Sequence, residues 1–221
     1  MMRSKLDMYE LPLFPLNTVL FPGMPLPLHI FEERYKEMIA DCIRENRPFG
    51  VVLVSEGLAA EEGSAAQPYA VGCTAEIAQV QPLDEGRMLI MTVGRERFRI
   101  VRLEYGKPYL VGMVEPAPLE TEPDDILSRD ADRLYPLVVD YLQKLATIGS
   151  LEIEEDQIPV DPVPLIYLAA TLIQLPAVEK QDFLSADRAS ALARKLERAY
   201  RRELGLMVTM PTEDIGIFSL N

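Results

Sequence analysis

Prolines interrupt the first forty residues of the chain and so limit what this segment can fold into. Proline lacks a backbone N–H and fixes its own φ, so a strand accepts it at an edge, at a start or at a bulge. Phe21-Pro22-Gly23-Met24 has the composition of a tight turn, because proline presets one φ and glycine permits a positive one. The sequence therefore predicts short strands joined by turns, punctuated by prolines 12, 15, 22, 25 and 27.

The spacing of apolar residues becomes helical after Phe31. Apolar side chains recur at three- and four-residue intervals on one face, and charged side chains fill the opposite face. This pattern predicts an amphipathic helix packed on a small sheet. The apolar positions are Tyr35, Met38, Ile39, Cys42 and Ile43.

Two classes of structure follow each other along the chain. Short strand-like runs continue as far as Val114, apart from a small and polar stretch at 55–68 that we expect to be a loop. A Pro- and Glu-rich break spans 115–123, and helical spacing dominates beyond it. We therefore expect an α+β protein, with an antiparallel β-barrel carrying one helix in residues 1–118. An α-helical bundle with a C-terminal tail would occupy residues 119–221.

Capping residues place two of the helices in the second half. Asp161 and Pro162 form an N-cap and a first-turn proline for a helix that is apolar on nearly every side, which predicts a central position. Ser185 is expected to cap the last long helix, and Gly205 is expected to end it.

The composition argues against several partners. The net charge of −13 opposes binding to a polyphosphate, so no nucleic-acid partner is expected. Residues 1–9 lack an apolar signal core, and the longest apolar helical run, 163–175, is short for a bilayer. We expect a cytoplasmic protein without a membrane partner. Cys42 and Cys73 are expected to be buried free thiols.

The sequence does not contain the motifs expected of a phosphate-binding loop, a histidine-assisted nucleophile or a zinc site. The Gly106-Lys107 pair is followed by proline and lacks the first glycine of a phosphate-binding loop. His29 is the single histidine, lies in an apolar run, and is expected to pack rather than to act as a base. One histidine and two distant cysteines give no zinc-ligand spacing. The sequence predicts no enzyme, no cofactor and no metal.

Two features remain as candidates for binding a peptide. Arg95, Arg97 and Arg99 alternate along a strand, so they would form a positive stripe that either pairs with glutamates such as Glu76 or docks an acidic segment. The turn containing Phe21, Pro22 and Met24 would either expose adaptable apolar side chains to a peptide or tuck into the core.

Four ordered motifs resemble one known family. Leu11 to Ile39 is similar to the opening of the substrate-binding domain of ATP-dependent Lon proteases, a domain that also occurs as a free-standing protein. Agreement continues through Val71–Ile77, Val93–Ile100 and Gln174–Leu184 with the helix that follows, and covers roughly residues 9 to 205.

The resemblance implies a β-rich domain of the PUA-like type followed by a helical bundle. It also implies a non-catalytic module, linked to protein quality control, that binds unfolded or apolar protein segments, with a separate protease or ATPase as a further partner. The ATPase and Ser-Lys peptidase domains of Lon proteases have no counterpart in these residues. The alternatives are RNA binding, which occurs among PUA-like barrels, and an unrecognised enzyme or peptidase accessory subunit. Neither the ligand nor the oligomeric state follows from the sequence.

Overall fold

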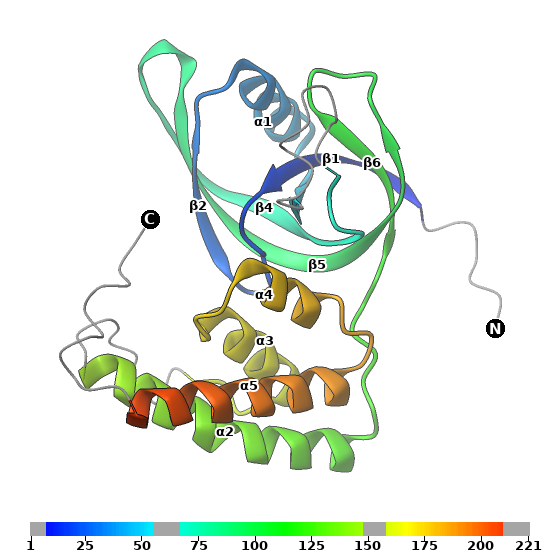
Figure 1. Ribbon diagram of the computed structural model, residues 1–221. Coiled ribbons are helices and arrows are strands. Elements are labelled where there is room, and N and C mark those ends of the chain that lie inside the picture. The colour runs from blue at the N-terminus through cyan, green and yellow to red at the C-terminus, as the bar shows by residue number, and fades with distance from the viewer. Residues whose placement is uncertain (1–7, 55–66, 148–157, 210–221) are drawn as a thin grey trace. The chain divides into compact units, whose positions relative to one another are not determined.

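The computed structural model describes residues 8–54, 67–147 and 158–209 (Figure 1). Most of the expected loop at 55–68 and the end of the C-terminal tail lie outside these residues. The strands are β1 (Tyr9–Leu16), β2 (Pro25–Ile30), β3 (Phe49–Leu53), β4 (Val71–Pro82), β5 (Met88–Glu104) and β6 (Leu110–Pro116). The helices are α1 (Glu33–Glu45), α2 (Asp124–Thr147), α3 (Pro162–Leu172), α4 (Ala177–Leu184) and α5 (Ala189–Thr209), with a short 3₁₀ turn at Asp84–Gly86.

The six described strands form one mixed sheet. Their order is β2-β5-β4-β3-β1-β6, and β5 also pairs with β6, so the long β5 bends round to meet the far strand. The expectation of an antiparallel barrel is confirmed only in part: the strands form a mixed sheet rather than a clean barrel, because β1 and β3 are parallel. A parallel pair needs a crossover connection, and the segment containing β2 and α1 supplies it.

The four prolines of the first motif that belong to strands lie where a missing N–H is tolerated. Pro25 and Pro27 belong to β2, an edge strand that pairs with β5 alone. Pro12 lies in the part of β1 that pairs with β6, and Pro15 lies in the part that pairs with β3. At each of these two prolines β1 pairs with a neighbouring strand on one side only, so the predicted edge placement is confirmed.

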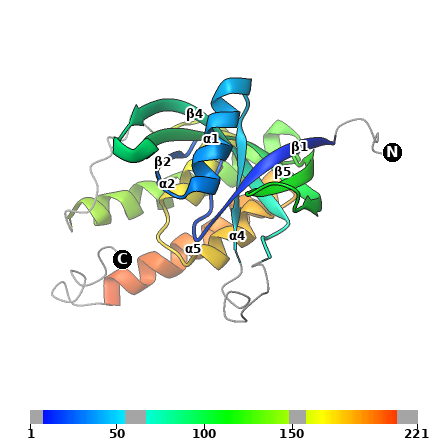
Figure 2. The ribbon, with the colours of Figure 1, turned by 90° about the horizontal axis from the view of Figure 1, so that it is seen from above.

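Helix α1 closes one end of the sheet with its apolar face. Figure 1 shows it between the β4–β5 ribbon and the β5–β6 hairpin, and Figure 2 views it from above. The ring of Phe14 on β1 stacks on that of Tyr35 with centroids 4.2 Å apart. The helix buries its predicted apolar residues except Ile43, which remains 46% exposed.

The chain divides into two compact units. The first contains residues 1–119 and 175–185, and the second contains 120–174 and 186–221. Helix α4 therefore belongs with the sheet, although it lies in the second of the two domains expected from sequence. Its Gln181 side chain is buried and donates a hydrogen bond of 2.9 Å from Nε2 to the backbone oxygen of Val71 on β4.

Helices α2, α3 and α5 pack against one another in the second unit. As predicted, α3 begins at Pro162 after the N-cap Asp161. The predicted cap of the last helix was wrong: Ser185 ends α4, and α5 starts at Ala189 with Glu122 accepting a hydrogen bond from the Ser190 N–H. Gly205 does not end α5, which continues to Thr209.

Candidate functional site

The turn at residues 21–24 and the start of the arginine run meet at Gly94. The N–H of Gly23 donates to Gly94 O over 2.8 Å, and the Gly94 N–H donates to Met24 O over 2.9 Å. Gly23 has the positive φ of +83° that the predicted turn requires. The Phe21 side chain is fully buried, whereas Pro22 and Met24 are half-buried and Met24 packs on the core. Of the two alternatives for this turn, the structure therefore favours packing against the core over exposure to a peptide.

The three arginines do not form a positive stripe. Arg95 is exposed and pairs with Glu76 of β4 at 2.6 Å, which confirms the cross-strand alternative for this residue. Arg97 is 3% exposed and Arg99 is half-buried. Strict alternation fails because the β4–β5 ladder shifts register between Cys73 and Ala75, so that Arg97 and the adjacent Phe98 are both buried.

A partly apolar face of β2, β5 and β4 has no covering element among the residues that the structure describes. Leu89 of β5 is paired with His29 and Gln81, and Met91 is paired with Pro27 and Gln79. All six positions are exposed, while Ile90 between them is buried on the other side of the sheet. We call this surface the ribbon face and define it by Pro27, His29, Gln79, Gln81, Leu89 and Met91.

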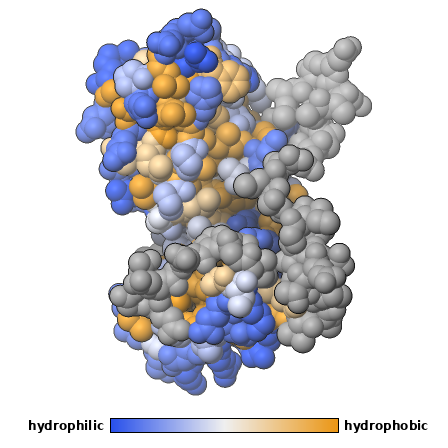
Figure 3. All heavy atoms as spheres, turned by 90° about the vertical axis from the view of Figure 1, so that its left-hand side faces the viewer, coloured by the Kyte–Doolittle hydropathy of each residue, from blue (hydrophilic) through white to orange (hydrophobic). Residues whose placement is uncertain are grey.

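The ribbon face carries a shallow groove of about 800 Å³. Leu89 is 42% exposed and Met91 is 36% exposed. Figure 3 looks at the side on which β2 and the ribbon lie and shows hydrophobic residues gathered there. No Asp, Glu, Lys or Arg is among the described residues that line the groove.

The residues of the ribbon face were not predicted as a site. Met88 to Val93 is an almost continuous apolar run, a pattern typical of strands buried on both faces. In the structure, one of the two faces of this strand is uncovered among the described residues. The apolar run alone does not show which face this is. His29 was expected to pack, but it is exposed, with its ring 5.5 Å from that of Phe31.

The two thiols are buried as predicted. Cys42 and Cys73 are both free, and burial raises their pKa values to about 11 and about 12. A thiolate is the reactive form, so neither residue is an activated nucleophile. Within the described ranges, no group of three His, Cys, Asp or Glu side chains is placed to hold a metal ion.

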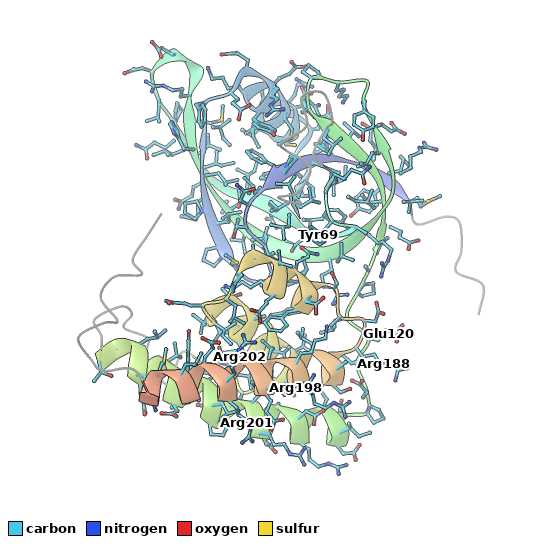
Figure 4. The ribbon with its side chains drawn as sticks, in the orientation of Figure 1. Tyr69, Glu120, Arg188, Arg198, Arg201 and Arg202 are labelled. Carbon is cyan, nitrogen blue, oxygen red and sulfur yellow. The ribbon has the colours of Figure 1, made fainter. Side chains whose placement is uncertain are left out.

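Two arginines of α5, and Arg188 just before the helix, lie close to acids of their own unit. Arg201 contacts Glu197 at 2.9 Å, Arg202 contacts Glu203 at 3.0 Å, and Arg188 lies 3.7 Å from Glu120. Figure 4 labels these three arginines and Glu120. A solvated helix face explains these charges. None of the helices in the described part of the chain has the length and apolar character needed to cross a membrane.

Comparison with known proteins places this chain among domains of one type. It is 28% identical to the Lon protease of Anaeromyxobacter dehalogenans over 179 residues, which are 79% of this chain and 21% of that protein. It is 27% identical to Lon protease 2 of Herpetosiphon aurantiacus, covering 90% of this chain and 24% of that protein. The chain thus spans about a fifth to a quarter of the length of these relatives.

Two solved structures have a similar fold. The Lon N-terminal domain protein from Xanthomonas campestris aligns with a TM-score of 0.60 and 25% identity, covering 92% of this chain and 99% of that one. The N-terminal domain of the Mycobacterium avium complex Lon protease aligns with a TM-score of 0.68 and 18% identity, covering 87% and 98%. Residues 10–199 match the family described as the ATP-dependent protease La (LON) substrate-binding domain, and the chain belongs to this family.

Proposed function

We propose that this chain is a non-catalytic module that binds apolar segments of other polypeptides on the ribbon face. The observation that carries the proposal is the exposed pair Leu89 and Met91 in the middle of a three-stranded surface. Apolar residues in adjoining rows of a sheet form a patch, and soluble proteins rarely expose a large contiguous patch without a use. Methionine adapts its shape to varied partners, which suits a module without a fixed ligand.

The energetics favour weak and permissive binding. Full burial of a Leu or Met side chain is worth about 1.5–3 kcal/mol, and Leu89 and Met91 have about two fifths of their surface left to bury. Each side chain then contributes on the order of 1 kcal/mol, so several contacts must act together. A groove without carboxylate, ammonium or guanidinium groups in its described lining selects little for the charge of the segment that it binds.

The residues first predicted to bind a peptide contribute less directly. Phe21 and Arg97 are buried, so their side chains do not reach a ligand without a rearrangement. Pro22, Met24, Arg95 and Arg99 remain secondary contacts in this proposal. In this proposal the main contacts with the polypeptide are made by Leu89 and Met91 of β5, not by the arginines of the same strand.

The proposal extends to the rest of the molecule. The family membership supports substrate recognition in protein quality control, with a separate protease or ATPase receiving the bound polypeptide. Helices α2, α3 and α5 are proposed to form a bundle that folds as a second domain in residues 119–221, with α4 docked on the PUA-like first domain of residues 1–118.

Binding of a permanently unfolded protein tests the proposal. Reduced, carboxymethylated α-lactalbumin with a fluorescent label is titrated with the wild-type chain and with the Leu89→Gln/Met91→Gln variant. We expect the variant to bind about tenfold more weakly, a difference of about 1.4 kcal/mol. Val101→Gln is the matched control, because Val101 lies on the same strand, is 52% exposed and is outside the groove. Equal affinity of all three proteins contradicts the proposal.

A further inference from the structure

A second pocket lies where α1 begins, at the end of the sheet. It has a volume of about 390 Å³, and its walls come from β1, α1, the end of β3 and the β5–β6 turn. Two cations and three tyrosines gather in it. They are Arg34, Lys107, Tyr35, Tyr105 and Tyr109, and we call this site the tyrosine–cation pocket.

The cations are held over aromatic rings. The Arg34 guanidinium lies 4.6 Å from the centre of the Tyr35 ring, and the Lys107 ammonium lies 5.3 Å from that of Tyr109. Lys107 also donates to the Tyr109 hydroxyl over 3.2 Å. Such contacts limit the freedom of long side chains, so less entropy is lost when a ligand binds them.

The charged groups that line the pocket are both cations, whereas the protein as a whole is acidic. No acidic residue is among those of the described chain that line it, although the whole sequence has a net charge of −13. Three acids lie close to the pocket but outside its lining: Glu32 is 2.8 Å from Arg34, Glu10 is 3.7 Å from Lys107, and Asp41 accepts a hydrogen bond of 2.8 Å from the Tyr109 hydroxyl. Both ion pairs are partly solvent-exposed and therefore weak, so an incoming carboxylate competes with them.

Shared residues connect this pocket to the ribbon face. A smaller pocket of about 260 Å³ contains Pro15, Arg34 and Tyr35 from the tyrosine–cation pocket, and Leu28 and His29 from the groove. Phe31 lines this connection with 58% of its surface exposed. The smaller pocket therefore adjoins both sites, and it borders Arg34 together with Glu32.

We propose that the tyrosine–cation pocket binds a carboxylate of the polypeptide whose apolar residues occupy the ribbon face. Arg34 and Lys107 provide charge-assisted hydrogen bonds, and Tyr105, 67% exposed on the β5–β6 turn, packs against the residue that carries the carboxylate. The inference rests on the proposed function, because it specifies the chemistry of the same class of ligand. The carboxylate comes from the C-terminus of the polypeptide or from an acidic side chain.

Three labelled peptides distinguish these sources. The first is an apolar hexapeptide with a free C-terminal carboxylate, the second is the same peptide with an amidated C-terminus, and the third is an amidated heptapeptide with an added glutamate. We expect the first, the third or both to bind at least about tenfold more tightly than the second at low salt. The preference identifies the source of the carboxylate.

Substitutions test whether the preference for a peptide with a carboxylate arises in the tyrosine–cation pocket. Arg34→Gln/Lys107→Gln is expected to abolish it and to leave the affinity for the amidated hexapeptide unchanged, which also shows that the variant is folded. Arg129→Gln/Lys144→Gln removes the same charges from ion pairs of α2 and should retain the preference. Tyr105→Ser alters a mostly exposed residue and should reduce the preference without a risk of misfolding.

The outcomes separate this inference from the proposed function. Equal binding of all three peptides overturns the inference, and so does a preference that survives in Arg34→Gln/Lys107→Gln. If binding of the amidated hexapeptide is weakened by Leu89→Gln/Met91→Gln while the carboxylate makes no difference, the proposed function stands and this inference fails. Absence of binding by all three peptides contradicts both.

Discussion

The backbone oxygen of Phe21 occupies the space in which a side chain on Gly94 would begin. A Cβ built on Gly94 lies 2.1 Å from that oxygen, far inside any van der Waals contact. The tight turn that begins at Phe21 therefore packs directly on Gly94, the glycine before the arginine run. This contact explains in physical terms why both motifs occur in one chain.

Gly94→Ala should therefore destabilise the first unit strongly. The two nearest atoms belong to the Phe21 backbone and cannot easily move aside, so we expect a loss of about 3 kcal/mol or more in the free energy of unfolding, at the upper end for overpacking. Urea denaturation measures the loss. Gly106→Ala is the control, because a Cβ there meets nothing within 4 Å, and its effect should be close to zero. Similar stabilities of the two variants would show that the contact is absent.

Burial of the two thiols predicts their reactivity. With pKa values raised to about 11 and about 12, Cys42 and Cys73 should not react with iodoacetamide at pH 8 in the folded protein, and should react once urea unfolds it. Mass spectrometry of the intact chain counts the modified thiols. Rapid labelling without urea would contradict the burial.

The same pKa shifts predict how stability changes at alkaline pH. The folded state holds both thiols protonated, whereas a thiol in the unfolded chain ionises near pH 8.5. Their contribution to stability is therefore complete below about pH 8.5 and is lost as the pH rises toward the folded values. Urea titrations at pH 7 and pH 10 should show a larger decrease for the wild type than for Cys42→Ala/Cys73→Ala. An equal decrease is the contrary result.

In the second unit, a buried hydroxyl joins two helices. Tyr200 of α5 donates a hydrogen bond of 2.9 Å to the backbone oxygen of Ala169 near the end of α3, and its ring lies edge-on to that of Tyr141 at 5.1 Å. Tyr200→Phe should lower the free energy of unfolding by about 1 kcal/mol, because a buried carbonyl loses a donor. Tyr105→Phe, at an exposed position, should have no measurable effect. If thermal unfolding does not distinguish the two variants, the bond is not formed.

Local patterns in the sequence predicted several elements because each element depends on nearby residues. The apolar spacing from Tyr35 to Cys42 gave the buried face of α1, and Asp161-Pro162 marked the start of α3. The parallel pairing of β1 with β3 was missed, because it depends on which strands meet across the sheet and short apolar runs do not record this. The start of α5 was missed because its N–H groups are met by Glu120 and Glu122, which are remote in sequence.

The candidate site was harder to predict than the fold. Alternation predicted one face for Arg95, Arg97 and Arg99, but a register shift buries Arg97. The apolar run around Leu89 resembled a core strand, and its exposure depends on the absence of a covering element in the described chain. The tyrosine–cation pocket joins Arg34 to a turn some seventy residues later, which no local pattern records.

Photocrosslinking tests the location of polypeptide binding most directly. The photoreactive residue p-benzoylphenylalanine is placed at Met91 or, as a control, at Val101, which is exposed on the same strand. Each protein is irradiated with carboxymethylated α-lactalbumin, and the crosslinked product is measured by gel electrophoresis. Binding on the ribbon face predicts strong crosslinking from position 91 and little from position 101. Equal yields from the two positions, or a higher yield from position 101, would contradict it.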